Sequence, residues 1–439
     1  MGSLLSLLLF LLLTIFLALK TSNFILSPQI GYLLGFILQA VFCLFYIDQW
    51  NIKLHPRTIL TIVGGGILFW IISFAVQDIS KKISTNNIQN TLKKQNYIEV
   101  EFFKLFLFVI FQTVVLLGYV HFMNANMNGL GLAAKIYDYR SRTADYGEII
   151  KIPKVLSFGR LLSSAIGYVL SLICVFNLLN KTLKYKFLFT LNIILSILLE
   201  GILGARGGIF NFIVAIFAEF LIIRYICFGK NISLKVLFKI FFAGCGLILL
   251  LPIAGKMMGR PNMGLIYEIA VYVGAPLKNL DIFLRDPTNY TSTHFSTLYG
   301  LLNDLQRWIP YGTWIATQRF RGKWQFIDGK TLGNVYTTYA NYWYDAGPIG
   351  VIIYTTLMAF LSQMLFQMAI NGKKHSMAMS IVLIILYVYF FSAIVFSFFT
   401  NKFLNQMFSL YSIKFIIAIM TMTFVTINIR LSINGKKIS

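Results

Sequence analysis

The sequence predicts an all-α, polytopic integral membrane protein with about eleven transmembrane helices, and its composition and long apolar runs carry that prediction. Of the 439 residues, 58% are hydrophobic and only 12% are charged, whereas about a quarter of the residues of a soluble chain carry charge. The runs reach roughly 15 to 24 residues, enough for a helix to cross a hydrocarbon core of about 30 Å. Soluble enzymes, secreted disulfide scaffolds and disordered chains are therefore excluded.

The expected spans and their orientation follow from the apolar windows and the charges between them. In chain order, the windows are residues 3–19, 30–47, 59–76, 105–123, 157–179, 187–203, 209–226, 238–254, 346–370, 377–399 and 409–428. Basic residues accumulate in alternate connections, such as the one that contains Lys373 and Lys374, and short basic connections are cytoplasmic. We therefore expect residues 1–439 to form one integral membrane domain, with the amino terminus outside and the carboxyl terminus inside.

Two outer connections are long, residues 124–156 and residues 255–345, and both carry more basic than acidic residues. Long loops cross the membrane largely regardless of charge, so this excess leaves the orientation unchanged. It indicates an outer face that meets an anion, although a merely solvated surface could have the same composition. The net charge of +23 does not predict nucleic-acid binding, because a chain that lies mostly in lipid offers no continuous basic face.

The loop 255–345 is expected to be structured. Its leucines at positions 298, 301, 302 and 305 recur at the spacing of an amphipathic helix, and Gly264 to Arg285 predicts a second helical stretch, broken at Pro276. Four tryptophans follow among basic residues: Trp308, Trp314, Trp324 and Trp343. An aromatic belt at the membrane interface explains this pattern, and aromatic faces that stack on sugar rings explain it equally.

A glycine-rich turn, Gly204-Ala205-Arg206-Gly207-Gly208, joins the sixth and seventh expected spans. The free amides of Gly207 and Gly208, the dipole of the following helix and the Arg206 guanidinium would together form a small anion site at the outer surface. Such a turn also simply connects two helices tightly. Glu219, in the middle of the next span, must face the helix bundle, either paired with Arg224 or as part of a proton relay.

The sequence contains no motif for a nucleotide, a catalytic metal or a hydrolase triad: GxxxxGK[ST], DxD, HExxH and GxSxG are all missing. The four histidines are scattered. We therefore predict no cofactor and no metal, and expect any reaction to take place outside on a substrate that is already activated.

From the glycine-rich turn onward the chain resembles the Wzy-type polymerases of bacterial O-antigen and capsule repeat units. The resemblance covers roughly residues 200–360. It is carried by the turn itself, by the stretch from Tyr267 to Leu284, and by Gly333 to Tyr339 followed by Tyr342-Trp343-Tyr344-Asp345-Ala346-Gly347-Pro348-Ile349-Gly350. The last motif is the most specific.

The resemblance implies a glycosyltransferase of GT-C architecture that acts at the outer face of the bacterial cytoplasmic membrane. The growing glycan on undecaprenyl pyrophosphate is the donor, one lipid-linked repeat unit is the acceptor, and the lipid pyrophosphate leaves. Without a metal, arginines must stabilise that leaving group, and a base must receive the acceptor's proton. The residues expected to bind substrate or pyrophosphate are Arg206, Arg260, Arg285, Arg319, Arg321, Gly207, Gly208, Tyr336 and Tyr339.

Asp345 and His294 are the candidate bases. Asp345 could equally cap the amino terminus of the ninth span, and His294 could be an ordinary loop residue. The expected partners are lipid-linked oligosaccharides, membrane lipid and a chain-length regulator protein. An O-antigen ligase, with the same donor and another acceptor, or a flippase for the same lipid-linked sugar remain alternatives, although we find no internal repeat of the kind many transporters have.

Overall fold

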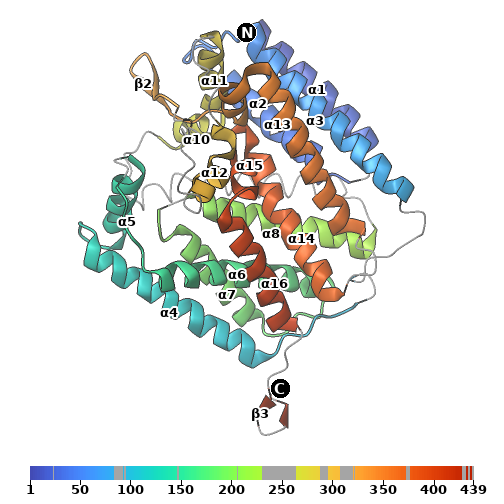
Figure 1. Cartoon of the computed structure of the whole chain (residues 1–439), viewed down its shortest axis with the longest axis vertical. Coiled ribbons are helices and arrows are strands. Elements are labelled where there is room, and N and C mark those ends of the chain that lie inside the picture. The colour runs from blue at the N-terminus through green and yellow to red at the C-terminus, as the bar shows by residue number, and fades with distance from the viewer. Residues whose placement is uncertain are drawn as a thin grey trace. The chain divides into compact units, whose positions relative to one another are not determined.

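The computed structural model describes residues 1–22, 24–83, 92, 95–145, 148–204, 206–229, 264–286, 295–306, 320, 322–371, 376–427, 432–433 and 436–437 (Figure 1). In this part of the chain, 9 helices are long and apolar enough to cross a membrane. They are α1 (Gly2–Thr21), α2 (Pro28–Phe45), α3 (Pro56–Ile83), α4 (Phe102–Asn126), α6 (Lys154–Leu179), α8 (Arg206–Phe228), α13 (Thr338–Asn371), α14 (Met377–Val395) and α16 (Leu410–Ile427). The chain is an all-α, multi-pass membrane protein.

Nine of the eleven expected spans thus correspond to one long apolar helix each. The sixth expected span forms α7 (Lys186–Gly201), whose 16 residues would extend about 24 Å at 1.5 Å per residue, somewhat short of the hydrocarbon core. The eighth, residues 238–254, lies outside the described residues. The count of eleven therefore stays a prediction.

The ninth span begins earlier than its apolar window indicated. Helix α13 starts at Thr338 and breaks at Ala346 and Gly347, which have non-helical backbone angles. Gly347 has φ 58° and ψ −141°, a conformation that favours glycine, and Pro348 has no amide hydrogen to continue the helical hydrogen bonds. The expected boundary at residue 346 is therefore a break within the helix, and the sequence window marked only the longer, apolar second half.

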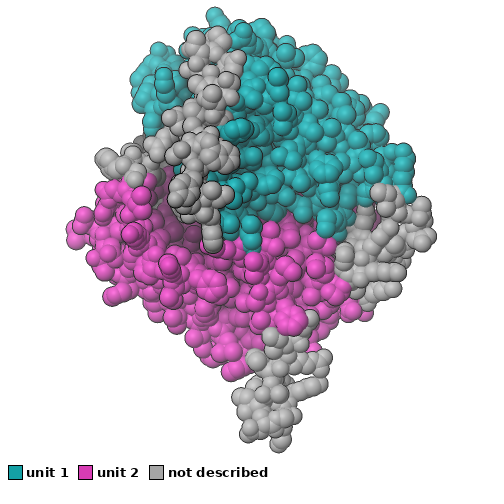
Figure 2. Space-filling model, viewed as in Figure 1, with its two compact units in different colours: residues 1–87, 264–368, 390–413 teal, residues 88–263, 369–389, 414–439 magenta. Residues whose placement is uncertain are grey.

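The described residues form two compact units, coloured in Figure 2. Unit 1 contains Met1–Asn87, Gly264–Met368 and Phe390–Ile413. Unit 2 contains Ile88–Met263, Ala369–Tyr389 and Lys414–Ser439. Each unit is thus assembled from three separate stretches of the chain.

In unit 1, helices α1, α2 and α3 pack on one another, and α2 also packs on η5 (Phe396–Phe398). The centre is aromatic: the rings of Tyr32 and Phe69 stack with centroids 4.4 Å apart, and the Tyr32 hydroxyl donates to that of Tyr339. Gly65 of α3 admits this contact, because a Cβ atom there would lie 1.9 Å from the Tyr339 hydroxyl oxygen. Tyr339 and Gly65 therefore hold α13 against α3.

In unit 2, α6 packs on α4, α7 and α8. A buried polar contact lies among these apolar helices: the Gln112 amide donates to the Ser196 hydroxyl at 3.0 Å, and Ser196 donates to the Ser163 carbonyl at 3.0 Å. The Tyr168 ring meets the Phe212 ring edge-on at 4.7 Å. Hydrogen bonds and aromatic contacts thus supplement apolar packing here, as in many helix interfaces within membranes.

Both long loops contain ordered elements, as expected of the larger one. The first holds α5 (Leu132–Arg140) and the π-helical turn η2 (Ser141–Asp145). The second holds α10 (Leu265–Val273), α11 (Ala275–Arg285), η4 (Ser296–Leu298), α12 (Tyr299–Gln306), β1 (Gln325–Ile327) and β2 (Lys330–Gly333). The remaining short elements are α15 (Lys402–Met407), β3 (Ser432–Ile433) and β4 (Lys436–Lys437).

The helical stretch expected from Gly264 to Arg285 is confirmed as two helices, but the break lies at Gly274 and not at Pro276. Pro276 stands in the first turn of α11, where its missing amide hydrogen costs nothing because that amide has no partner within the helix. The amphipathic helix expected around residue 298 is present as η4 and α12.

Candidate functional site

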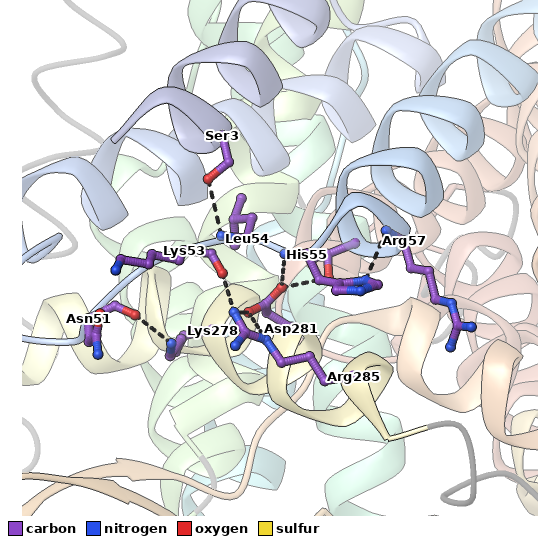
Figure 3. Close-up of polar contacts among 10 residues, drawn as sticks. Ser3, Asn51, Lys53, Leu54, His55, Arg57, Lys278, Asp281 and Arg285 are labelled. Atoms are coloured by element: carbon purple, nitrogen blue, oxygen red, sulfur yellow. Dashed lines mark hydrogen bonds and ion pairs between the residues drawn. The ribbon is translucent and has the colours of Figure 1, made fainter.

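A cluster of polar contacts in unit 1 lies where α11 meets the residues ahead of α3 (Figure 3). Its centre is Asp281, whose side chain is fully buried. One carboxylate oxygen, Oδ1, accepts the backbone N–H of His55 at 2.6 Å and the hydroxyl of Thr58 at 2.8 Å. Because amides at the start of a helix have no partner within it, Asp281 caps the amino terminus of α3 from another element.

The second oxygen of Asp281 holds Arg285, one helical turn further along α11. Arg285 Nε donates to Oδ2 at 3.0 Å, and its Nη2 lies 2.7 Å from the same oxygen. Nη2 also donates to the carbonyl oxygen of Lys53. These contacts fix the plane of the guanidinium, while 46% of the Arg285 side chain stays exposed and Nη1 has no hydrogen-bond partner among the described residues.

Further basic side chains lie around this pair. Lys53 and Arg57 are exposed, and the Arg57 side chain points away from Asp281 in Figure 3. Lys278 is buried, and its Nζ donates to the Asn51 carbonyl at 2.7 Å. Burial lowers the pKa of Lys278, and the neighbouring Asp281 opposes that shift. We call Lys53, Arg57, Lys278 and Arg285 the α11 basic cluster. Asp281 is the acid that pairs with it, so the group is net positive.

Of this cluster, only Arg285 was predicted from the sequence, as a residue that binds pyrophosphate. Lys53, Arg57 and Lys278 were not among the predicted site residues. Two local features of the sequence point to parts of the cluster. The i, i+4 spacing of Asp281 and Arg285 favours an ion pair on one helix, and Pro56 after His55 favours a helix that begins at Pro56. The pairing of two segments more than 200 residues apart has no such local signal.

A β-hairpin stands beside α11. Asn279 of α11 donates its amide to the carbonyl of Val335 at 2.9 Å and to that of Leu332 at 3.3 Å, and Tyr267 donates to Thr331 at 3.2 Å. Because a two-stranded hairpin is marginal alone, these bonds hold it in place. Trp324, expected to stack on sugar, adjoins the hairpin and is 58% exposed.

Tyr336 and Tyr339, both expected to contact substrate, are buried. The Tyr336 hydroxyl donates to the Lys323 carbonyl at 3.0 Å and accepts the Gln325 amide at 2.9 Å. Burial raises the pKa of Tyr336, and the Gln325 bond counteracts the shift. The described contacts of both tyrosines are therefore those of packing residues. Trp343 is half-buried in α13.

Asp345, the favoured candidate base, caps a helix other than its own. Its Oδ1 accepts the backbone N–H of Ser296 and its Oδ2 that of Thr297, each at 2.8 Å. The Thr297 carbonyl in turn accepts the side-chain amide of Asn401 at 3.0 Å. The Asp345 side chain is buried, and both of its oxygens are engaged. The expected cap on the ninth span is thus not what the described contacts show: Asp345 caps η4, ahead of α12, in the long loop that precedes that span.

The glycine-rich turn lies in unit 2, and Arg206 is the first residue of α8, as expected for a helix amino terminus. Gly208 lies tightly against Glu200: a Cβ atom there would be 2.6 Å from Glu200 Oε2. Arg140 of α5 donates to the Gly204 carbonyl at 3.2 Å. The turn is therefore hydrogen-bonded to the first long loop, and it has the tight geometry of a connection. Gly207 is exposed.

Six residues of the predicted site lie outside the described residues: Arg260, His294, Trp308, Trp314, Arg319 and Arg321. Of the remainder, the structure places Arg285, Trp324, Tyr336, Tyr339, Trp343 and Asp345 in unit 1, and Arg206, Gly207 and Gly208 in unit 2. Within the described segments, no group of three or more His, Cys, Asp and Glu side chains is placed to hold a metal ion.

No family model, no curated protein and no solved structure matches the chain.

Proposed function

We propose that this membrane protein is a glycosyltransferase that polymerises oligosaccharide repeat units carried on undecaprenyl pyrophosphate. The reaction takes place at the outer face of the bacterial cytoplasmic membrane, and the lipid pyrophosphate is the leaving group. The proposal combines the sequence motifs between residues 200 and 360 with an anion-binding surface in the segments expected to lie outside.

The observation that carries the proposal is the α11 basic cluster, and above all the way in which Arg285 is held. Asp281 and the Lys53 carbonyl occupy Nε and Nη2. No described residue accepts from the remaining nitrogen, Nη1, which can therefore donate to an anion. The side chain loses little further freedom on binding because its plane is already fixed. A pyrophosphate can accept from this nitrogen, and the exposed Lys53 and Arg57 add positive charge to the surrounding surface.

Such a preorganised cation suits a reaction in which negative charge develops on the departing pyrophosphate. A donor that meets this charge stabilises the transition state more than the bound substrate and so raises turnover. In this proposal, Arg206 at the start of α8 and the loop residues Arg260, Arg319 and Arg321 are further candidates for the same task. Trp324 and Trp343, with Trp308 and Trp314, are the candidate sugar-stacking residues.

The acceptor hydroxyl must lose a proton, and Asp345 and His294 remain the proposed bases. The hydrogen bonds of Asp345 to Ser296 and Thr297 favour a positioning role for Asp345, because both carboxylate oxygens already accept backbone amides. A chain-length regulator protein is the proposed macromolecular partner.

Purified protein in lipid nanodiscs, supplied with lipid-linked repeat units, tests the proposal directly. We expect a ladder of lengthening glycans, and we expect Arg285→Lys to reduce its rate of growth. Removing one preorganised donor typically lowers the rate by about 10² to 10³.

Arg142→Lys is the matched control. Arg142 lies in the first long loop and bonds Glu148 at 2.7 Å, so the same substitution there should leave the ladder unchanged. Transfer to a lipid core without polymer growth would instead indicate a ligase. Movement of the lipid across the bilayer without any transfer would indicate a flippase. Either result, obtained with folded protein, would contradict the polymerase proposal.

A further inference from the structure

A buried acid in unit 2 plays no part in the proposed reaction. Glu219 lies in α8, and its side chain is fully buried. Neither Glu219 carboxyl oxygen has a hydrogen-bond partner among the described residues. In the described segments, no ion pair within 4.0 Å includes Glu219. The expected pairing with Arg224 is therefore not present there.

The surroundings of Glu219 come from α6, which packs on α8. Gly167 of α6 receives the Phe212 ring of α8, where a Cβ atom would lie 2.9 Å from the ring. Ser171 and Cys174 follow one and two turns further along α6 and interact with the carboxyl of Glu219, which lies two turns beyond Phe212. The acid thus occupies a close helix–helix interface.

The hydrogen-bond chemistry of this interface favours one protonation state. Ser171 donates its hydroxyl hydrogen to the Tyr168 carbonyl at 3.0 Å, and it would have to give up that bond to donate to a carboxylate instead. A carboxylate can only accept, so a charged Glu219 would either break the Ser171–Tyr168 bond or accept from the weak Cys174 thiol alone. A carboxylic acid has an O–H group, which can donate to the Ser171 oxygen.

No charged side chain of the described neighbouring helices pairs with Glu219. Of the described helices, α6 and α7 pack on α8. These three helices carry their charged side chains near their ends or beyond the position of Glu219: Lys154 and Arg160 on α6, Lys186 and Glu200 on α7, and Arg206 and Arg224 on α8. Their other ionisable groups, Tyr168, Cys174, Tyr225 and Cys227, carry no positive charge in either protonation state. An unpaired carboxylate in a membrane helix is strongly unfavourable.

We propose that Glu219 is a proton-binding site, a carboxyl group that holds its proton within the α6–α8 interface at neutral pH. The neutral acid can donate its O–H to the Ser171 oxygen, whereas loss of the proton would place an uncompensated charge between two tightly packed helices. Proton release at Glu219 is thereby coupled to the separation of α6 and α8. This proposal does not depend on the polymerase activity.

Infrared difference spectroscopy of the full chain in nanodiscs tests this assignment, because a protonated carboxylic acid has a carbonyl stretch that a carboxylate lacks. We expect the wild-type minus Glu219→Gln spectrum to show one such band from about pH 6 to about pH 9, well above the ordinary range for a glutamate. We also expect the melting temperature of Glu219→Gln to equal that of the wild type, since glutamine mimics the neutral acid.

Glu148→Gln is the matched control. Glu148 is 47% exposed and pairs with Arg142, so its difference spectrum should lack the band. A Glu219→Gln spectrum without the band would overturn the proposal. In that case, a lowered melting temperature would identify an ion pair between Glu219 and a basic residue outside the described segments.

Discussion

Asp281 offers a way to separate the stability of unit 1 from the orientation of Arg285, because its two oxygens have different partners. Oδ1 accepts from His55 and Thr58 at the start of α3, and the described partner of Oδ2 is Arg285. Asp281→Asn can keep an oxygen at the first position and place an NH₂ group at the second. The substitution should therefore preserve the cap on α3 and release Arg285.

The expected magnitudes differ for asparagine and alanine. Hydrogen bonds to charged groups contribute about 1.5 to 3 kcal/mol each, and the ion pair adds at most about 1 kcal/mol because Arg285 is 46% exposed. Asp281→Ala loses both buried bonds and should reduce the free energy of unfolding by about 3 to 5 kcal/mol. Asp281→Asn keeps them as weaker neutral bonds and should lose about 1 to 2 kcal/mol.

Two measurements on the same preparations test this reasoning. Unfolding in denaturant gives the stability of both variants, and polymer growth in nanodiscs gives their activity. We expect Asp281→Asn to be nearly as stable as the wild type yet as slow as Arg285→Lys. If Asp281→Asn destabilises the protein as much as Asp281→Ala, the proposal that Oδ1 caps α3 while Oδ2 orients Arg285 is wrong. If Asp281→Asn polymerises at the wild-type rate, the orientation of Arg285 does not matter.

Four further predictions follow. Asp345→Asn turns an NH₂ group toward a backbone amide and should lower stability by about 1 to 3 kcal/mol, with activity falling only in proportion; a rate loss of about 10² to 10⁴ at unchanged melting temperature would instead identify a base. Gly65→Ala should destabilise unit 1 by about 1 to 3 kcal/mol through its clash with Tyr339, and a second change, Tyr339→Phe, should recover part of the loss. Arg206→Lys should be impaired and Arg206→Ala nearly inactive, both at normal melting temperature, whereas an arginine that only anchors the hairpin should tolerate lysine. Labelling of single cysteines from outside tests the topology, with reaction expected at Asn126 and Asn289 and none at Asn87 and Asn371.

The long helices could be predicted because each depends on its own composition. Apolar windows located nine of them. Pro276 correctly indicated that the stretch from Gly264 to Arg285 is interrupted, although the break lies two residues earlier, at Gly274. The start of a helix was harder to predict where a more polar first part of the helix precedes an apolar second part. Helix α13 begins at Thr338, eight residues before its apolar window. Its first turns contain Tyr339 and Tyr342, which are buried against other helices, and the hydropathy of the sequence does not reveal that burial.

The candidate site was harder to foresee because its contacts join distant parts of the sequence. Asp345 was expected to cap the ninth span, whereas its partners, Ser296 and Thr297, belong to another helical turn almost fifty residues earlier. Asp281 likewise binds residues near position 55. Residue type alone indicates that a carboxylate needs donors, and only the fold determines which ones it finds.

The discontinuity of unit 1 has a consequence for biogenesis. Helices α1 to α3 leave the ribosome about 180 residues ahead of the segments that complete their unit, an interval of roughly 10 to 40 seconds at common elongation rates. Throughout that time the His55 amide lacks Asp281, and the Gln39 side chain lacks the Phe398 carbonyl to which it donates at 2.8 Å. Unmet polar groups are costly in lipid. The first three helices must therefore wait at the translocon, beside an insertase, or in temporary pairings that the later segments displace.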